Sequence, residues 1–195
     1  MPPLFSPLSS EERRAILALA RGAILEAIVD DPVPDYRLPS GRLAETRGAF
    51  VTLYLRRRLR GCMGRAETSD PLAETVAQTA VNAALHDPRF APVSREEVSE
   101  LEIEVSVLSE LRPISADAIE AGTHGVVVSR GERRALLLPQ VAAERRWSSS
   151  RFLAEACRKA GLDPEAWRDP QTLLFGFTVE VVSESRLRPD YSSST

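Results

Sequence analysis

The sequence predicts a single α+β domain with a mainly antiparallel sheet flanked by helices. Most predicted strands occur in hairpin pairs, and the helical segments between them lack the regular strand–helix–strand alternation of a parallel sheet. With 195 residues, the chain is long enough for one large domain, or for one domain with an inserted lobe. Its hydrophobic content of 43% and charged content of 27% are those of a soluble globular protein.

Helices are predicted where apolar residues recur at helical spacing behind a capping signal. Ser9 and Glu12 have the spacing of a capping box, which begins the first helix. Asp70 as N-cap, followed by Pro71, begins the second. Gly161 ends a later helix. The predicted helices are 10–29, 70–86 and 150–160, with short helices at 117–120 and 163–167.

Strands are predicted where apolar and polar residues alternate, or where β-branched and aromatic residues gather. The stretch 101–108 alternates almost perfectly. Arg56–Arg58 make the turn of a first hairpin, Arg130 and Gly131 make the turn of a second, and Pro139 ends it. The predicted strands are 49–55, 59–64, 101–108, 126–129, 134–138 and a long final strand over 173–182.

Charge and cysteine content narrow the classes of function. The net charge of −3 argues against a general nucleic-acid-binding surface. Cys62 and Cys157 do not make a disulfide scaffold, and a structural zinc site would lack the usual close cysteine spacing. We therefore predict no metal, and no cofactor-binding motif is present. No apolar segment approaches the length of about 18 residues that a membrane span requires, so we expect a cytoplasmic protein.

The stretch Leu59–Gly64 contains the main candidate for chemistry. Cys62 stands between Gly61 and Gly64, close to Arg60. A thiol in that setting suits a nucleophile, and we predict Cys62 to be catalytic. The backbone amides there suit a nest for an anion. The predicted ligand-binding residues of this stretch are Arg60, Gly61 and Gly64. The alternative is an inert cysteine packed in a tight turn that requires glycine.

His124 and Glu144 are the predicted partners of the thiol. His124 lies in a glycine-flanked loop before a strand and is predicted to be the general base. Glu144 is predicted to orient the imidazole, completing a cysteine–histidine–carboxylate set. The alternatives are a hydrogen-bonded loop histidine and a solvated charge. His86 closes a helix and is interpreted as structural.

The remaining charged candidates are arginines. The cluster Arg56–Arg60 is suited to phosphate or RNA, but only Tyr54 is near enough to stack on a base, so a solvated hairpin turn is favoured. Nucleic acid is therefore not an expected partner. Asp87 and Arg89 are predicted to pair locally and hold a proline turn, and Arg89 is also a candidate for ligand binding.

These motifs give the chain a resemblance to the AMMECR family, whose prokaryotic members are called AmmeMemoRadiSam system protein A. The family hallmark is Leu-Arg-Gly-Cys-Ile-Gly, which stands here as Leu59–Gly64 with Met63 in place of Ile. The resemblance spans residues 10–185. The other matching stretches are 48–53, 87–90, 105–108, 124–125, 137–142 with Glu144 and Trp147, 152–153, Cys157 and 159–162.

The resemblance implies a two-lobed fold. One AMMECR-type domain spans 1–195, with both termini in a larger lobe, a smaller lobe inserted in the middle, and the signature near the cleft between them. Gln140, in the matching stretch 137–142, joins the predicted ligand-binding residues. The tail 186–195 is predicted to be disordered. Prokaryotic members lie beside, or are fused to, a Memo-type protein and a radical SAM protein, which implies these two as partners.

Two functions are expected from the residues and the resemblance together. The first is a cytoplasmic cysteine-based enzyme, or enzyme component, that carries out thiol-based group transfer or hydrolysis on a small molecule or a modified macromolecule. The second is a non-catalytic adaptor in a radical SAM–Memo assembly. RNA binding through Arg56–Arg60 is the weakest alternative.

Overall fold

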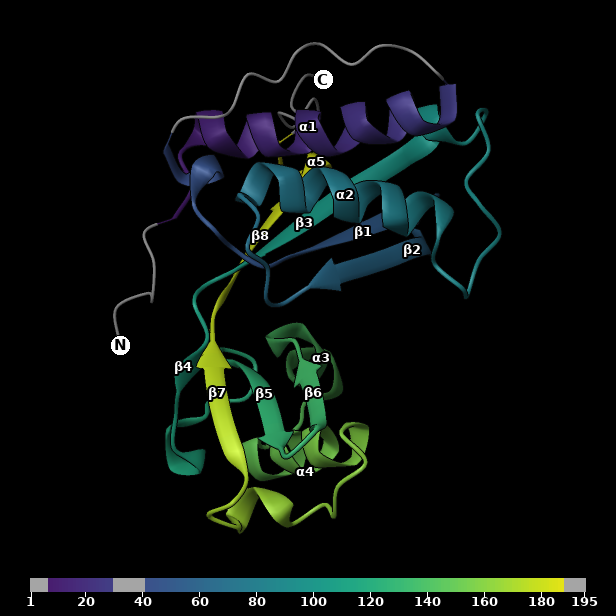
Figure 1. Ribbon diagram of the computed structural model, residues 1–195. Helices are drawn as coiled ribbons and strands as arrows, with labels where there is room; N and C mark the ends of the chain where they lie inside the picture. Colours follow the sequence, from purple (N-terminus) through teal and green to yellow (C-terminus); the bar gives the residue numbers. More distant parts are fainter. Residues whose placement is uncertain (1–6, 30–40, 188–195) are drawn as a thin grey trace, which may run out of the picture. The chain divides into compact units, whose positions relative to one another are not determined.

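The computed structural model describes residues 7–29 and 41–187. The chain divides into two compact units, each with its own four-stranded sheet and hydrophobic core (Figure 1). Within the described chain, the terminal unit comprises residues 7–29, 41–107 and 180–187. Within the described chain, the inserted unit is Leu108–Val179. Every strand pair of known register is antiparallel, so the predicted α+β fold class is confirmed.

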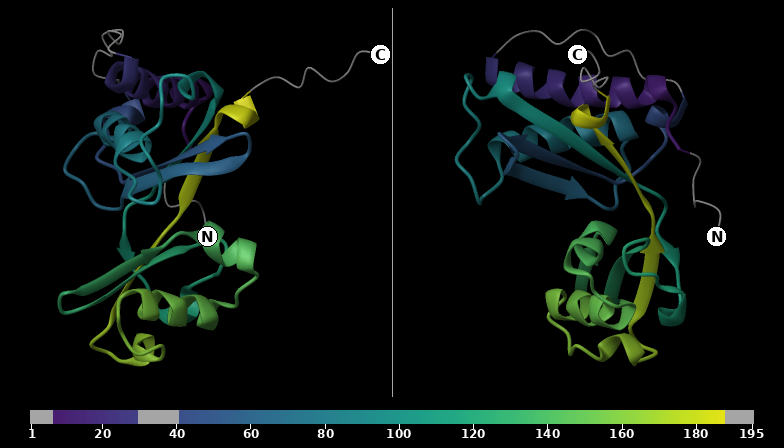
Figure 2. Two further views of the ribbon diagram at one scale, coloured as in Figure 1. Left: turned by 90° about the vertical axis from the view of Figure 1, so that its right-hand side faces the viewer. Right: turned by 180° about the vertical axis from the view of Figure 1, so that it is seen from behind.

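The terminal unit is a two-layer structure. Its sheet has the strand order β2-β1-β3-β8, and α1 and α2 lie together on one face of it, as both views of Figure 2 show. Its elements are α1 (Ser10–Val29), η1 (Gly41–Ala44), β1 (Ala49–Leu55), β2 (Arg58–Arg65), α2 (Leu72–Leu85), η2 (Val98–Glu100), β3 (Leu101–Leu108), β8 (Val179–Ser183) and α5 (Glu184–Leu187).

The core of the terminal unit follows from the alternation of its strands and from small residues on α2. Val51 and Leu53 of β1 are completely buried against the helices, whereas Thr52 between them points to the other face. Ala80 and Ala83 of α2 let the helix backbone come close to the sheet. The α2 layer therefore rests almost directly on the strand backbones.

The starts of the two long helices test the capping predictions. The Ser9 N–H donates to Glu12 Oε2 at 2.8 Å, and the Glu12 N–H donates to Ser9 Oγ at 3.1 Å, so the capping box is confirmed. The prediction that Asp70 is an N-cap is wrong. Pro71 occupies the N-cap position of α2 without a side-chain cap, and the Asp70 carboxylate lies 3.7 Å from Arg65.

The inserted unit has the strand order β4-β7-β5-β6, with α4 packed on one face. Phe152 and Leu153 of α4 are buried against Val126 and Val128 of β5. Its elements are β4 (Arg112–Pro113), η3 (Ala116–Ala118), β5 (Gly125–Arg130), β6 (Arg133–Leu137), α3 (Pro139–Arg145), α4 (Ser149–Lys159), η4 (Ala166–Arg168) and β7 (Leu173–Phe177).

The predicted final strand is in fact two strands. It breaks at Thr178, so that β7 belongs to the sheet of the inserted unit and β8 to that of the terminal unit. The Ser109 N–H donates to the Thr178 carbonyl at 2.9 Å, and the Thr178 N–H donates to Ser109 Oγ at 3.0 Å. These bonds join the two chain segments where they leave and re-enter the terminal unit. Hydrophobic alternation continues through the break, so it does not reveal the change of sheet.

Three smaller predictions also need correction or extension. Pro139 ends the hairpin as predicted, but it also begins α3, a helix that the sequence did not predict, because proline at the first helical position has no N–H to leave unsatisfied. The short helices predicted at 117–120 and 163–167 are single 3₁₀ turns. Within the predicted disordered tail, residues 186 and 187 belong to α5, and the rest lies outside the described residues.

Candidate functional site

Cys62 lies on β2, at one edge of the sheet in the terminal unit. The register places it directly opposite Thr52 of β1, and Thr52 directly opposite Glu104 of β3. Directly opposed residues in an antiparallel sheet point to the same face. Gly61 and Leu53, the neighbouring pair of residues on the two strands, face α2 and the core. The side chains of Cys62, Thr52 and Glu104 therefore point away from both long helices. A thiol, a hydroxyl and a carboxylate therefore form one row on the face that α1 and α2 leave uncovered.

The sulfur of Cys62 is held by Thr52. Thr52 Oγ1 donates to Sγ at a distance of 3.4 Å, and the Cys62 side chain is half-buried. Cys157, by contrast, is completely buried in the core of the inserted unit, where burial raises the pKa of its thiol. The two cysteines therefore have opposite environments, and only Cys62 suits contact with a ligand.

Asp87 and Arg89 hold the backbone of Cys62 from the open side of the edge strand. The Cys62 N–H donates to Asp87 Oδ2 at 2.8 Å, and Arg89 Nη2 donates to the Cys62 carbonyl at 3.1 Å. Arg89 also donates from Nε and Nη2 to the two Asp87 oxygens, at 2.9 and 2.6 Å. Both backbone groups that an edge strand would leave unpaired are satisfied at Cys62, which fixes the peptide carrying the thiol.

The hydrogen-bonded contact between Asp87 and Arg89 shifts the pKa values of both side chains. Asp87 is only 4% exposed, and the hydrogen-bonded guanidinium of Arg89 holds the pKa of Asp87 far below its usual range, against the opposing effect of burial. The pKa of Arg89 is raised, first by Asp87 and, among the smaller causes, by Cys62. The Arg89 side chain is 53% exposed and lies over the Phe90 ring, 5.5 Å from its centroid. Arg89 therefore places an exposed guanidinium beside the thiol, with its charge paired to that of Asp87.

Arg60, predicted to bind a ligand, is already engaged by the protein. Its Nε and Nη2 donate to the two carboxylate oxygens of Glu97 at 2.9 and 2.8 Å, and Nη1 and Nη2 donate to the carbonyls of Ala91 and Pro92. This guanidinium lowers the pKa of Glu97. Arg60 thus ties the segment 91–97 to the hairpin, which gives it a structural role.

The glycines of the signature do not form the predicted nest. A nest requires a left-handed residue, and both Gly61 and Gly64 lie in the extended strand β2 without a positive φ. A Cβ on Gly61 would lie 2.1 Å from the Ala83 carbonyl oxygen of α2, and one on Gly64 would lie 2.1 Å from the Phe50 ring. Close packing, not anion binding, therefore accounts for these glycines.

His124, Glu144 and Gln140 all belong to the inserted unit. His124 is 7% exposed, and its Nδ1 accepts the Glu120 N–H at 3.1 Å, as expected for a hydrogen-bonded loop histidine. Glu144 is exposed on α3 and forms no hydrogen bond or ion pair with any described residue. Gln140 lies half-buried in the first turn of α3. Cys62 belongs to the terminal unit, so the assembly of Cys62, His124 and Glu144 stays a prediction.

Three contributors to the site were missed by sequence reasoning. Thr52 and Glu104 occupy polar positions in alternating strands, but only the register shows that they align with Cys62. Asp87 was predicted to pair with Arg89, but not to reach the backbone of Cys62. Among residues 7–29 and 41–187, no three His, Cys, Asp or Glu side chains gather in a way that suits a metal ion. No helix in that part of the chain has the length and apolarity to cross a bilayer.

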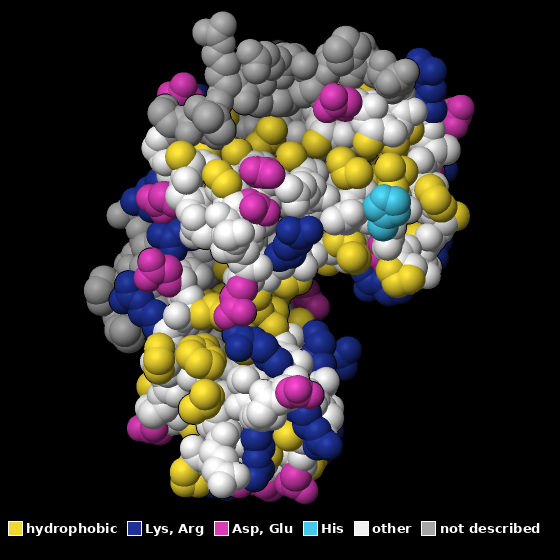
Figure 3. All heavy atoms as spheres, viewed as in Figure 1, with side chains coloured by type: hydrophobic (Ala, Val, Ile, Leu, Met, Phe, Trp, Pro, Cys, Tyr) yellow, Lys and Arg dark blue, Asp and Glu magenta, His cyan; other side chains and the backbone are white. Residues whose placement is uncertain are grey.

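The charged surface shows no concentration of one sign on the face seen in Figure 3. There, basic and acidic side chains are interspersed over the described parts of both units. At the hairpin tip, Arg56 is itself paired with Glu100, with Nε 2.9 Å from Oε2. The face drawn in Figure 3 therefore lacks the uniform positive field that supports phosphate-backbone binding.

Comparisons with known proteins agree with the sequence motifs. The AMMECR1 family model matches residues 17–182. A protein of Methanothermobacter thermautotrophicus is 38% identical over 194 residues, covering 92% of this chain and 98% of that protein. A protein of Methanopyrus kandleri is 41% identical over 187 residues, covering 91% and 90%. The crystal structure of uncharacterized protein PH0010 from Pyrococcus horikoshii matches with a TM-score of 0.79 at 37% identity, covering 89% and 92%. The chain therefore belongs to the AMMECR1 family.

Proposed function

We propose that the chain is a thiol-dependent enzyme, or the thiol-bearing component of one, in a cytoplasmic pathway shared with a Memo-type protein and a radical SAM protein. The observation that carries the proposal is the setting of Cys62. Its thiol is half-buried on an uncovered sheet face, and its peptide is held at both the N–H and the carbonyl. A reactive group requires such support, whereas a cysteine that only fills space, such as Cys157, does not.

The proposed chemistry is nucleophilic acyl transfer. The sulfur of Cys62 adds to the carbonyl carbon of a substrate, the bond to the leaving group breaks, and the leaving group departs with the electron pair and gains the thiol proton. Water then adds to the thioester carbonyl, the C–S bond breaks, the acyl group leaves as a carboxylic acid, and a proton from the water restores the thiol. Thr52 orients the sulfur, and Arg89 Nη1, the one guanidinium nitrogen that Asp87 and the Cys62 carbonyl leave open, is placed to donate to an oxygen of the substrate. The proposal rests on Cys62 and not on His124, whose Nδ1 is occupied by a backbone N–H.

The proposal is tested with p-nitrophenyl acetate as a model acyl donor. Release of p-nitrophenolate and acetylation of the protein are followed together, by absorbance and by intact mass. We expect acetyl transfer to Cys62, followed by turnover beyond one equivalent. Cys62→Ser removes both signals. Cys157→Ser is the matched control and leaves both unchanged, because the Cys157 thiol is buried.

The outcome also separates the enzyme from the adaptor. Acetylation that stops at one equivalent, or turnover that persists in Cys62→Ser, contradicts the enzyme proposal. The pathway assignment is tested by co-purification with the Memo-type and radical SAM proteins encoded in the same genome. Binding of both partners without turnover would favour the non-catalytic adaptor.

A further inference from the structure

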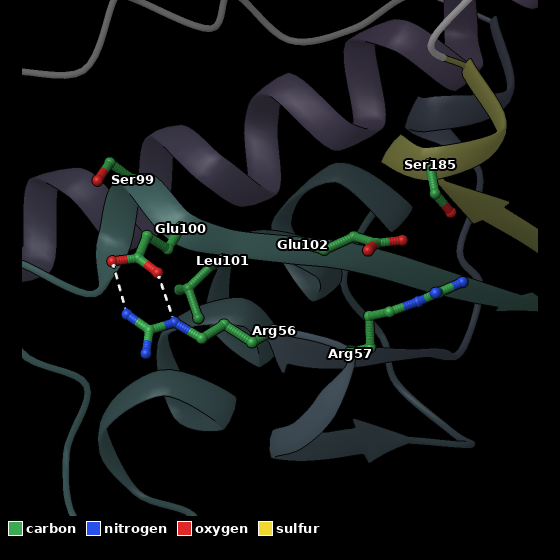
Figure 4. A pocket seen from close by; sticks show the side chains of 7 residues that line it. All are labelled: Arg56, Arg57, Ser99, Glu100, Leu101, Glu102 and Ser185. Carbon is green, nitrogen blue, oxygen red and sulfur yellow. Dashed lines mark hydrogen bonds and ion pairs between the residues drawn. The ribbon is translucent and has the colours of Figure 1, made fainter. Parts of the chain in front are cut away.

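We propose a second site in the terminal unit, a pocket that binds a small zwitterion of the α-amino-acid class. The pocket lies at the tip of the β1–β2 hairpin, where the turn meets the start of β3 (Figure 4). Its volume of about 480 Å³ falls in the range of small-molecule sites. The side chains used in the argument below are Arg56, Arg57, Glu100, Leu101, Glu102 and Ser185.

One ion pair in the pocket is already complete. Arg56 donates from Nε to Glu100 Oε2 at 2.9 Å and from Nη2 to Oε1 at 3.3 Å, so both carboxylate oxygens are engaged. The dashed lines in Figure 4 mark these two bonds. The charges of Arg56 and Glu100 therefore offset each other and leave the recognition of a ligand to the other charged residues.

The other two charges have no partner in the described chain. Neither Arg57 nor Glu102 forms a hydrogen bond or ion pair with any residue in 7–29 or 41–187. In Figure 4 both side chains extend toward the same end of the pocket, the end where Ser185 lies. The Ser185 hydroxyl shares a hydrogen bond of 2.8 Å with Ser183 and keeps further capacity for a ligand. One positive, one negative and one neutral polar group thus converge on the same space.

This combination selects the charge type of the ligand. A simple anion that binds Arg57 is repelled by Glu102, and a simple cation that binds Glu102 is repelled by Arg57. A ligand with a carboxylate and an ammonium group satisfies both. Leu101 also lines the pocket, but its side chain is only 3% exposed and packs in the core of the terminal unit, so recognition of a ligand rests on the polar groups. The opposite charges of Arg57 and Glu102, with the Ser185 hydroxyl beside them, together suit a free amino acid.

The backbone of the turn gives independent support. Arg56 and Arg57 have φ values of 50° and 65°, in the left-handed region that glycine and asparagine enter most easily. Arginine can occupy both positions of the turn, but its side chain strains the backbone there. A role for the Arg57 side chain in binding explains why this residue stands there. The site does not include Cys62, so the inference is independent of the proposed function.

The test is calorimetric titration of the full chain with each common L-amino acid. For L-leucine the matched probes are 4-methylpentanoate, which lacks the amino group, and 3-methylbutylamine, which lacks the carboxylate; analogous pairs serve for any other amino acid that binds. We expect at least one amino acid to bind and both of its single-charge analogues to bind at least about tenfold more weakly, because each leaves one charge of the pocket unsatisfied.

Variants locate the binding. Arg57→Gln and Glu102→Gln weaken the affinity for the amino acid by at least about tenfold. Arg58→Gln is the matched control, because Arg58 is exposed in the same hairpin but does not line the pocket. Cys62→Ser also leaves the affinity unchanged. Failure of every amino acid to bind, equal binding of a single-charge analogue, or full affinity in Arg57→Gln would overturn the inference.

Discussion

Asp87 is the residue on which the geometry of Cys62 depends most. Its buried carboxylate accepts hydrogen bonds from the Cys62 N–H, the Arg89 N–H and the Arg89 guanidinium. The local pair with Arg89 was predictable, because the two residues stand close in the sequence. The bond to Cys62 was not, because only the packing of α2 against β2 brings residues 62 and 87 together.

Replacing Asp87 therefore destabilises the protein. In Asp87→Asn the ion pair with Arg89 is lost, and the amide NH₂, which accepts no hydrogen bond, takes the place of a carboxylate oxygen that accepts two donors. We expect the free energy of unfolding to fall by about 2–3 kcal/mol in urea denaturation. Asp70→Asn is the control. The Asp70 carboxylate lies 3.7 Å from Arg65 at the surface, and its loss changes stability by less than about 1 kcal/mol. Equal effects of the two substitutions would contradict this role for Asp87.

The lowered pKa of Asp87 predicts that the free energy of unfolding depends on pH. Because the pKa of Asp87 is lowered in the folded state, its contribution to stability is fully present above the unfolded-state value of about 3.9 and is lost as the pH falls below it. The difference in unfolding free energy between the wild type and Asp87→Asn should be constant above about pH 5 and shrink below about pH 4. If the difference in unfolding free energy between the two proteins grew as the pH fell, this account of Asp87 would be contradicted.

At the scale of elements, the contact between β2 and α2 determines where the signature lies. The sequence predicted the hairpin and its return arm correctly but interpreted the signature glycines as exposed amides for an anion. The pattern shows that a glycine stands in a strand, but not which neighbour approaches it. In the structure Gly61 meets the backbone of α2, and Gly64 meets a side chain. The glycines therefore place Cys62 on the uncovered face instead of binding a ligand themselves.

This difference between the two glycines is measurable. In Gly61→Ala the new Cβ meets the Ala83 carbonyl oxygen, which cannot move without shifting α2. In Gly64→Ala it meets the ring of Phe50, which can rotate. We expect Gly61→Ala to lower the free energy of unfolding by about 3 kcal/mol or more, and Gly64→Ala by a smaller amount. Thermal and urea unfolding of both variants check the order, and the reverse order would contradict the packing described here.

At the scale of the whole molecule, the residue pattern predicts the fold class and the family resemblance implies a smaller inserted lobe, but neither shows where the chain passes from one unit to the other. Alternation identified most strands, because one face of each is buried. It did not show that the stretch 173–182 changes sheet at Thr178, because the alternation continues through the break. Nor did it show the register that aligns Thr52 and Glu104 with Cys62, since register depends on pairing between distant strands.

The two-unit organisation predicts that the terminal unit folds alone. Ser109 and Thr178 are hydrogen-bonded where the chain leaves and re-enters this unit, and β3 and β8 are neighbours. Replacing residues 110–177 by Asn-Gly should therefore give a soluble protein with a cooperative thermal transition, because the core of the terminal unit stays intact. Circular dichroism and calorimetry check this, and a chain with no cooperative transition would contradict it.

The central claim is that the fold presents the thiol of Cys62 for chemistry and buries that of Cys157. The most direct measurement is alkylation of the native protein with iodoacetamide, followed by peptide mass analysis. The account predicts modification of Cys62 in the native state, and modification of Cys157 only after unfolding. A native protein in which Cys62 resists alkylation, or in which Cys157 reacts equally fast, would contradict it.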